Sequence, residues 1–229
     1  TNAHKSSPLM LNKDILTTEN MGSKLQDLLT NGAIEVDYRY RGGALGSSNA
    51  DGVININTGS IRYHVDNYNE EYGDYGNALL DTVLHEMTHV LMMHAERQNY
   101  QNNNIPTELG IDNFKTSQLI QGYDTNFVAE YEAQYVSNQV INRLGIETTQ
   151  KSQQRMAAFK DLIEREGHGS QIQYELLDNL VEEMLSNIST IGDITKVLST
   201  QFDMFDADVK ISQVSEDMRP ILSKIQAFN

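Results

Sequence analysis

A long amphipathic segment, residues 77–97, carries two histidines four residues apart and constrains the fold more than any other part of the sequence. The apolar residues of this segment recur every three to four positions, at Leu80, Leu84, Met87 and Leu91. This spacing predicts a helix that packs one side against a core. Because residues i and i+4 of a helix project from the same face, His85 and His89 can direct one ring nitrogen each at a shared point. The remainder of the chain therefore has to fold around a helix that presents two imidazoles side by side.

The segments before this helix have the patterns of a small sheet. Residues 33–40 alternate in polarity and are rich in Ile, Val and Tyr, which predicts a strand. The glycine-rich run 41–52 is expected to form a loop. Residues 53–57 and 61–65 alternate apolar and polar side chains on either side of a turn at residues 58–60, which predicts a β-hairpin.

Helices predominate in the rest of the chain. Besides the histidine-bearing segment, helices are predicted at residues 18–31, 126–144, 148–166, 171–188, 194–198 and 211–228. Gly32, Gly145 and Gly167 stand at expected helix ends, and Pro220 is expected to interrupt the last helix. The tyrosine-rich acidic run 66–76 is expected to be a loop. A small sheet followed by helices predicts an α+β fold.

Charge and composition exclude several classes of partner. The formal net charge of −15 leaves too few clustered Lys and Arg to neutralise phosphates, so no nucleic-acid partner is expected. No stretch approaches the roughly 20 apolar residues that a membrane-spanning helix requires. The chain contains no cysteine, so a metal site would have to use His, Asp and Glu. Because the sequence begins at Thr1 and not at a methionine, a processed form or a fragment is expected.

The two histidines belong to the motif His85-Glu86-Met87-Thr88-His89. Two neutral imidazoles on one helix face suit a zinc ion. Glu86 follows the first of them, which places its carboxylate beside such an ion, where it can take a proton from an attacking water. A catalytic zinc generally takes three protein ligands, so the motif predicts a third ligand further along the chain.

The third ligand is sought among histidines and carboxylates. A third His at the spacing typical of metzincins is absent, because Met92 and Ala95 stand at the Gly and His positions, and this excludes that class. The remaining histidines considered are interpreted as surface or packing residues: His64, His94 and His168. The predicted helix 126–144 offers Glu130 and Glu132. Two positions along a helix turn a side chain by about 200°, so only one of these carboxylates can face the metal.

The segment from Tyr123 to Ala133 resembles the second ligand-bearing helix of the gluzincins, in which a small residue follows the ligand Glu by three positions, as Ala133 follows Glu130. It resembles more closely the catalytic domains of anthrax lethal factor and related bacterial toxin and effector peptidases. These domains place a tyrosine seven residues before that Glu, as Tyr123 stands here. The resemblance covers residues 79–137 at most, and it favours Glu130 over Glu132 as the third ligand.

This resemblance implies a zincin-like metalloprotease domain of α+β class, with a small twisted sheet, an active-site helix and a largely helical C-terminal part. Residues 1–145 would form the catalytic core, and residues 146–229 a helical subdomain packed on it. An edge strand, either 53–57 or 61–65, would pair with extended substrate. The chain departs from the gluzincin pattern at Gln134, where an acidic residue often orients a zinc-bound imidazole. The carbonyl of Gln134 could accept the same hydrogen bond.

The resemblance also implies roles for individual residues. His85, His89 and Glu130 would bind Zn2+, Glu86 would act as general base, and Tyr123 would donate its hydroxyl to the oxyanion that forms on a peptide carbonyl. The expected activity is that of a zinc-dependent endopeptidase acting on a protein or peptide. The resemblance further implies a secreted toxin or effector, delivered into a host cell.

Two other functions fit the same sequence. A degenerate peptidase fold could serve as a non-enzymatic interaction protein, with the helical C-terminal third as its docking module. A zinc hydrolase could instead act on a non-peptide amide. Zinc content after dialysis separates the first alternative from an enzyme, and a screen of candidate protein substrates separates the second.

Overall fold

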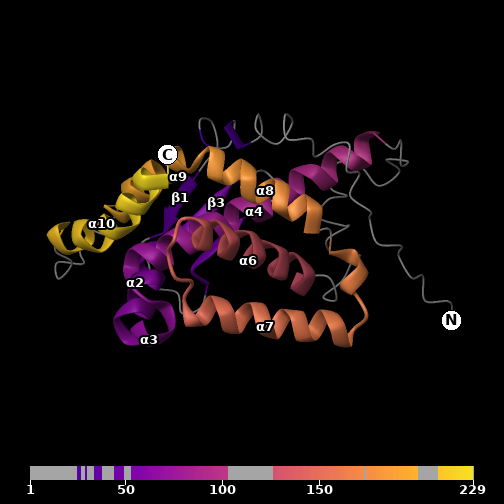
Figure 1. The fold of residues 1–229 in the computed structure, drawn as a ribbon, viewed down its shortest axis with the longest axis horizontal. Helices are drawn as coiled ribbons and strands as arrows, with labels where there is room; N and C mark the ends of the chain where they lie inside the picture. Colours follow the sequence, from indigo (N-terminus) through magenta and orange to yellow (C-terminus); the bar gives the residue numbers. More distant parts are fainter. Residues whose placement is uncertain are drawn as a thin grey trace.

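The structure is a computed structural model that describes residues 25, 26, 29, 34–37, 44–48, 53–102, 126–172, 174–200 and 211–228. Within these residues the chain is mostly helical and adds one small sheet (Figure 1), which confirms the α+β class at a coarse level. None of the described helices is long and apolar enough to cross a membrane. Of the helix expected at residues 18–31, positions 25, 26 and 29 are described, and they are helical.

The sheet consists of β1 (Ile34–Asp37), β2 (Gly46–Ser48) and β3 (Ile54–Asn57) in the order β1-β3-β2. Strand β1 pairs with β3 in parallel, and β2 pairs with β3 antiparallel. Two predictions are therefore wrong. The glycine-rich run 41–52 contains a strand, and residues 53–57 form the central strand and not an edge. The central position agrees with the nearly complete burial of Ile54 and Ile56.

The predicted second hairpin strand at residues 61–65 is also wrong, because helix α2 (Thr58–Asn67) occupies this part of the chain. The helix begins where the side chain of Asn57 accepts a hydrogen bond of 2.8 Å from the backbone N–H of Ser60, which is how an N-cap residue starts a helix. A short helix, α3 (Asn69–Tyr72), then lies within the expected loop 66–76.

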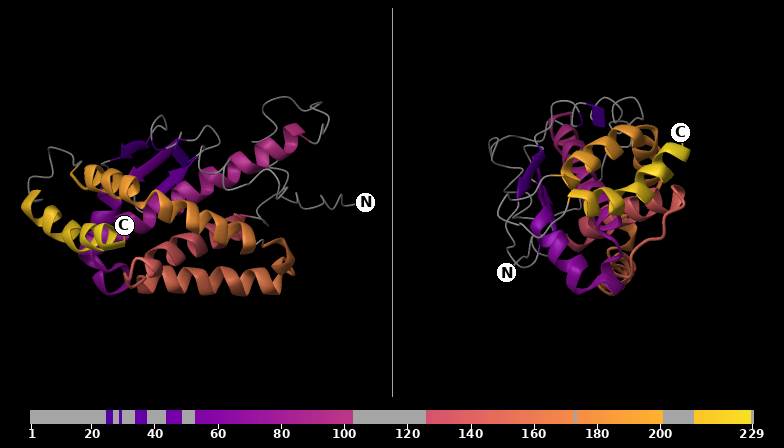
Figure 2. Two further views of the ribbon diagram at one scale, coloured as in Figure 1. Left: turned by 45° about the horizontal axis from the view of Figure 1, so that its top comes forward. Right: turned by 90° about the vertical axis from the view of Figure 1, so that its left-hand side faces the viewer.

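Helix α4 (Tyr75–Asn102) carries both histidines of the motif. It contains the predicted segment 77–97 and continues past its expected end to Asn102. Strands β2 and β3 contact one side of α4, and helix α6 (Asn126–Arg143) contacts it elsewhere. In the left view of Figure 2 the strands and α6 lie on opposite sides of α4. Helix α4 therefore lies between the sheet and helix α6.

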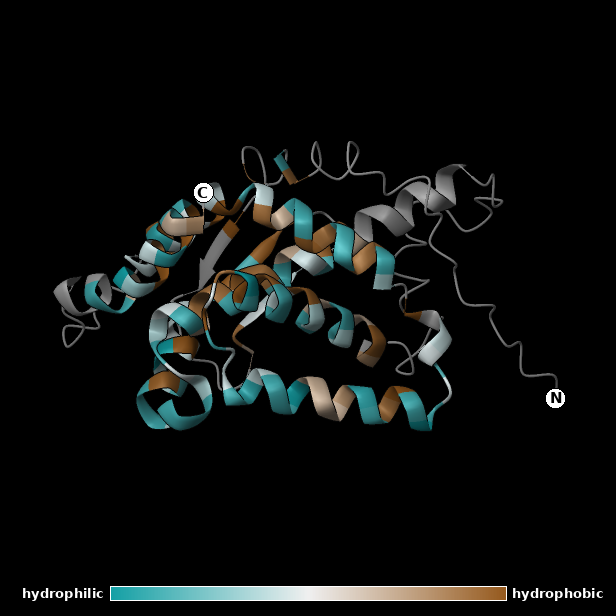
Figure 3. Cartoon of the chain, in the orientation of Figure 1, coloured by the Kyte–Doolittle hydropathy of each residue, from teal (hydrophilic) through white to brown (hydrophobic). Residues whose placement is uncertain are grey.

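Helix α6 ends as predicted. Gly145 has a φ of 68°, and the N–H of Ile146 donates to the carbonyl oxygen of Ile141 at 3.1 Å, which closes the helix end. Helix α7 (Gln150–Arg165) follows and packs along α6. Figure 3 shows that α7 is mostly hydrophilic. Its buried Ile163 forms a small apolar cluster with Val128 and Tyr131, against which Met156 and Phe159 of the same helix also pack.

The remaining described helices are α8 (Tyr174–Ser186), α9 (Ile188–Ser199) and α10 (Ile211–Phe228). The short piece expected at residues 194–198 is the end of the longer α9, and α10 continues through Pro220 without the expected interruption. Apolar side chains from these three helices join the same buried core as those of α4 and α6. Of the helices that follow residue 145, α9 and α10 contact the histidine-bearing helix, whereas α7 and α8 contact α6.

Candidate metal centre

Helices α4 and α6 meet through polar side chains on two successive turns. His85 of α4 lies opposite Glu130 of α6, and one turn away Asp81 lies opposite Gln134. Residue numbers thus increase along one helix where they decrease along the other, so the two helices are antiparallel here. This arrangement places each pair of i and i+4 residues on a shared face.

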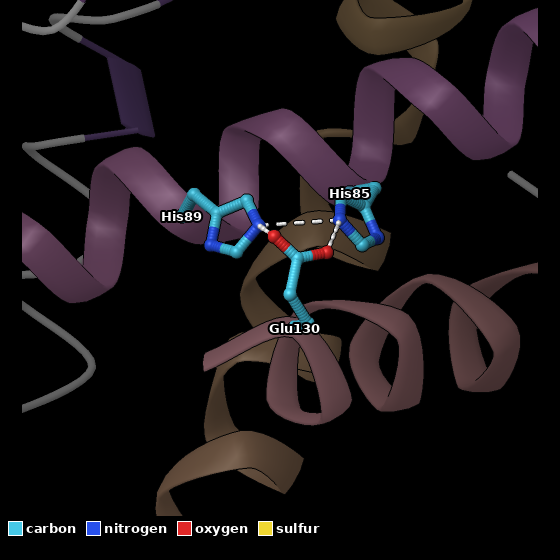
Figure 4. Close-up of side chains that lie close together, drawn as sticks. All are labelled: His85, His89 and Glu130. Atoms are coloured by element: carbon cyan, nitrogen blue, oxygen red, sulfur yellow. Dashed lines mark hydrogen bonds and ion pairs between the residues drawn. The ribbon is translucent and has the colours of Figure 1, made fainter. Parts of the chain in front are cut away.

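His85, His89 and Glu130 converge at one point (Figure 4). The Nε2 atom of His85 lies 3.1 Å from Oε2 of Glu130, and the Nε2 atom of His89 lies 3.3 Å from Oε1. The two Nε2 atoms are 3.2 Å apart. Among the residues that the structure describes, this is the one group of three or more His, Asp and Glu side chains placed to hold a metal ion.

The group is only partly exposed to solvent. His85 is 6% exposed, whereas the side chain of Glu130 is 31% exposed. The two imidazoles stand edge to face, with ring planes at 80°. Both rings direct Nε2 at the same carboxylate, and Glu130 is the most exposed of the three side chains.

The electrostatics of the group favour a cation at its centre. Burial alone would raise the pKa of Glu130, but hydrogen bonds from His85 and His89 outweigh burial and hold the pKa of this carboxyl well below its usual range. Burial alone would lower the pKa of His89, but the hydrogen bond and charge of Glu130, with a further contribution from Glu86, raise the pKa of His89 above its usual value. The carboxylate of Glu130 thus favours a positive charge between the two rings, whether that charge is a proton or a metal cation.

Glu86 is 7% exposed and lies under the edge strand β2. A Cβ atom on Gly46 of that strand would lie 2.8 Å from Cγ and 3.0 Å from Oε1 of Glu86. Only glycine permits so close an approach of the strand to α4. Since the charge of Glu86 contributes to the raised pKa of His89, the carboxylate also lies within electrostatic reach of that ring.

The structure separates Glu132, His64 and His168 from this group. Glu132 is 8% exposed and is not among the residues whose ligand atoms converge. His64 lies on α2, where its Nδ1 contacts the carbonyl oxygen of Ser60 at 2.8 Å, and His168 packs against Phe127. Tyr123 lies outside the described residues, as does the side chain of His94.

Sequence reasoning missed Asp81, which lies one helical turn before His85. Its Oδ1 accepts hydrogen bonds from Nε2 of Gln134 at 3.0 Å and from Oγ of Ser137 at 2.5 Å. Its Oδ2 accepts one from Oγ of Ser152 at 2.6 Å. The only signal in the sequence was the i−4 spacing from His85. That spacing acquires meaning only once α6 is known to pack on this face.

The donor set fits zinc. Two imidazole nitrogens and a carboxylate are common zinc ligands, and they leave a coordination position open. The second ring nitrogen of His85 is buried without a partner among the described residues, so it is available for the supporting hydrogen bond that ligating histidines usually make. No protein-family model, no curated protein and no solved structure matches the chain.

Proposed function

We propose that this protein is a zinc-dependent endopeptidase with a zincin-like active site of the gluzincin type, in which His85, His89 and Glu130 bind the metal. The observation that carries the proposal is the convergence of two Nε2 atoms and a carboxylate, supplied by two helices, with all three ligand atoms within 4.8 Å of one another. A third ligand at this place completes a zinc site that the motif on α4 leaves unfinished.

Zinc held by these residues would supply the Lewis acidity that activates a water and polarises a peptide carbonyl. Glu86 is the general base in this proposal: it accepts the proton of the attacking water and then donates it to the leaving amine. Two features support this role. Glu86 directly follows His85 on helix α4, and its side chain lies against Gly46 of strand β2. Tyr123 is proposed, on the resemblance alone, as the hydroxyl donor to the oxyanion.

An extended peptide is the substrate that the surroundings of Glu86 favour. Strand β2 pairs with β3 and forms one edge of the described sheet. A peptide that adds to the outer edge of β2 as a further strand would pass beside Gly46 and hence beside Glu86. This geometry favours cleavage within a chain over hydrolysis of a small amide. The net charge of −15 favours neutral or basic peptides. Membership of the secreted toxins and effectors is proposed from the resemblance.

One experiment tests the proposal as a whole. The full chain is loaded with Zn2+, dialysed, assayed for metal and incubated with a peptide library whose products are identified by mass spectrometry. About one zinc per chain and cleavage inside peptides, both absent in a His85→Ala/His89→Ala variant, are the expected results. A chain that retains no zinc would instead be a binding protein on a degenerate fold. Retained zinc with turnover of small amides only would indicate the non-peptide hydrolase.

A further inference from the structure

A second polar layer lies one helical turn from the candidate ligands, between α4 and α6. It centres on Gln134, which is fully buried, and on the half-buried Asp81. These residues occupy the positions four before His85 and four after Glu130. Each therefore lies on the same helix face as a candidate ligand.

The amide of Gln134 has a fixed orientation. Its Nε2 donates to Oδ1 of Asp81 at 3.0 Å and to Oδ1 of Asn138 at 3.1 Å. A carboxylate can only accept hydrogen bonds, so the atom of Gln134 that faces Asp81 has to be the NH2 group. Asp81 is itself held by the hydroxyls of Ser137 and Ser152. The carbonyl oxygen Oε1 of Gln134 is consequently the atom left over.

Two buried polar atoms of this interface have no partner among the described residues, and they are complementary. One is Oε1 of Gln134, an acceptor, and the other is Nδ1 of His85, which can donate. His85 already directs Nε2 at Glu130, and Figure 4 shows its other ring nitrogen pointing away from that carboxylate. Leaving both atoms unpaired is unfavourable in a buried site. The structure does not pair these two atoms with each other, and a hydrogen bond between them would satisfy both.

We propose that Gln134 and Asp81 are positioning residues of the metal centre. Gln134 accepts a hydrogen bond from Nδ1–H of His85, and Asp81 holds the amide so that its oxygen, and not its NH2 group, faces the ring. This fixes His85 in the tautomer whose Nε2 lone pair is free for a cation. The inference rests on the proposed function insofar as zinc is that cation. It also accounts for an amide at position 134, where gluzincins often have an acidic residue. Here the negative charge lies on Asp81, which contacts the ring of His85 only through the amide of Gln134.

Zinc affinity of the full chain is the first measurement, by competition with a chelator. Asp81→Asn lets the amide turn over, and Gln134→Met removes the acceptor, so each is expected to weaken zinc binding about 10- to 100-fold. Glu183→Gln is the matched control, because Glu183 is also a buried carboxylate that accepts from an amide, that of Asn187 at 3.0 Å, but lies on α8. It is expected to leave zinc affinity unchanged. Asp81→Asn within twofold of wild type would overturn the inference.

A double variant separates positioning from simple packing. Gln134→Glu sets two carboxylates against each other and is expected to weaken zinc binding. Adding Asp81→Asn to it restores a donor opposite the introduced carboxylate and is expected to recover the affinity. Asp81→Asn is thus harmful when Gln134 is retained and beneficial when it is combined with Gln134→Glu. If it is harmful in both backgrounds, Asp81 is merely structural and the inference fails.

Nuclear magnetic resonance provides a readout that does not need catalysis. In the zinc-loaded chain, Nδ1–H of His85 is expected as a slowly exchanging resonance that exchanges faster in Gln134→Met. In the zinc-free chain, the NH2 group of Gln134 is expected to show contacts to Asn138 that Asp81→Asn abolishes. If wild type binds no zinc, the proposed function fails, while the zinc-free spectrum still decides whether Asp81 orients the amide. Unchanged contacts in Asp81→Asn would overturn that part.

Discussion

Gly46 of the edge strand β2 lies directly against the side chain of Glu86 on helix α4. A Cβ atom at position 46 would approach Cγ of Glu86 to 2.8 Å and Cγ2 of Thr82 to 2.9 Å. The strand backbone therefore forms one wall for the carboxylate. The same strand is the proposed docking edge for a peptide. Strand β2 would therefore position both the proposed base, Glu86, and the bound substrate.

Gly46→Ala is expected to lower kcat/KM by about 100-fold, because an added methyl group displaces Glu86 and small displacements of a catalytic group are that costly. Zinc affinity should stay unchanged, since the atoms nearest to the added Cβ belong to Glu86 and Thr82 and not to a candidate metal ligand. The matched control is Gly169→Ala, where an added Cβ meets nothing within 4 Å. Peptide cleavage and metal content are measured for both variants. Full activity in Gly46→Ala would show that the position of Glu86 does not matter.

Glu86→Gln is expected to lower peptide hydrolysis by about 10²- to 10⁴-fold while zinc remains bound, because the change removes a base and not a ligand. Gln has nearly the same shape, so the buried position is preserved. Metal content and thermal stability are compared with wild type to verify this. Retained activity would exclude Glu86 as the base.

Glu130→Ala and Glu132→Ala separate the two candidate carboxylates. Loss of Glu130 is expected to weaken zinc binding by more than the about 10- to 100-fold that follows from losing a hydrogen-bond partner of a ligand. Glu132 is 8% exposed, so its loss is expected to reduce stability without reducing zinc affinity. Zinc affinity and thermal unfolding are measured for each. The reverse pattern of affinities would transfer the ligand to Glu132.

Zinc is expected to stabilise the folded chain, because it binds a site that the unfolded chain lacks. At a free zinc concentration 100 times Kd the gain is about 2.7 kcal/mol, which corresponds to a rise in Tm of about 5 to 10 °C for a chain of this length. A chelator should reverse the rise. His64→Ala, outside the site, should preserve it, and the His85→Ala/His89→Ala variant should abolish it. An equal rise in that variant would indicate binding elsewhere.

The zinc-free chain is expected to show a specific pH dependence. The raised pKa of His89 adds stability below the ordinary value of 6.5, and this is lost as pH rises through the raised pKa. The lowered pKa of Glu130 adds stability above 4.5, and this is lost as pH falls through the lowered pKa. Glu130→Gln should therefore cost most between these values. Urea unfolding across this range and up to pH 9 measures the difference, which should shrink at the alkaline end.

The long helices could be predicted because their apolar residues repeat over many turns. Residues 61–65 could not, since Ile61, Tyr63 and Val65 suit both a strand and a helix. The structure decides the matter: Ile61 and Val65 are buried, whereas Tyr63 is 38% exposed. That is the outcome for a helix, in which positions i and i+4 share a face but i+2 does not. Strand β2 consists of glycine and serine, whose strand propensity is low, so only its pairing with β3 defines it.

The candidate site divides in the same way. His85, Glu86 and His89 are local in sequence and could be singled out from their spacing. Glu130 was preferred to Glu132 only on the resemblance, because the sequence does not reveal which face of helix α6 packs against α4. Asp81 stayed hidden, since its partners Gln134, Ser137 and Ser152 come from two later helices.

The contact between α4 and α6 includes a layer of polar side chains, and the apolar core around these helices draws on other parts of the molecule. Where Asp81, Gln134, Ser137 and Asn138 meet, hydrogen bonds between polar side chains join the two helices. Helices α8, α9 and α10 carry no candidate ligand, but their apolar side chains belong to the same buried core as those of α4 and α6. A protein engineer who trimmed the chain back to a minimal piece carrying every ligand would thus discard the scaffolding that holds the two halves of the site in alignment.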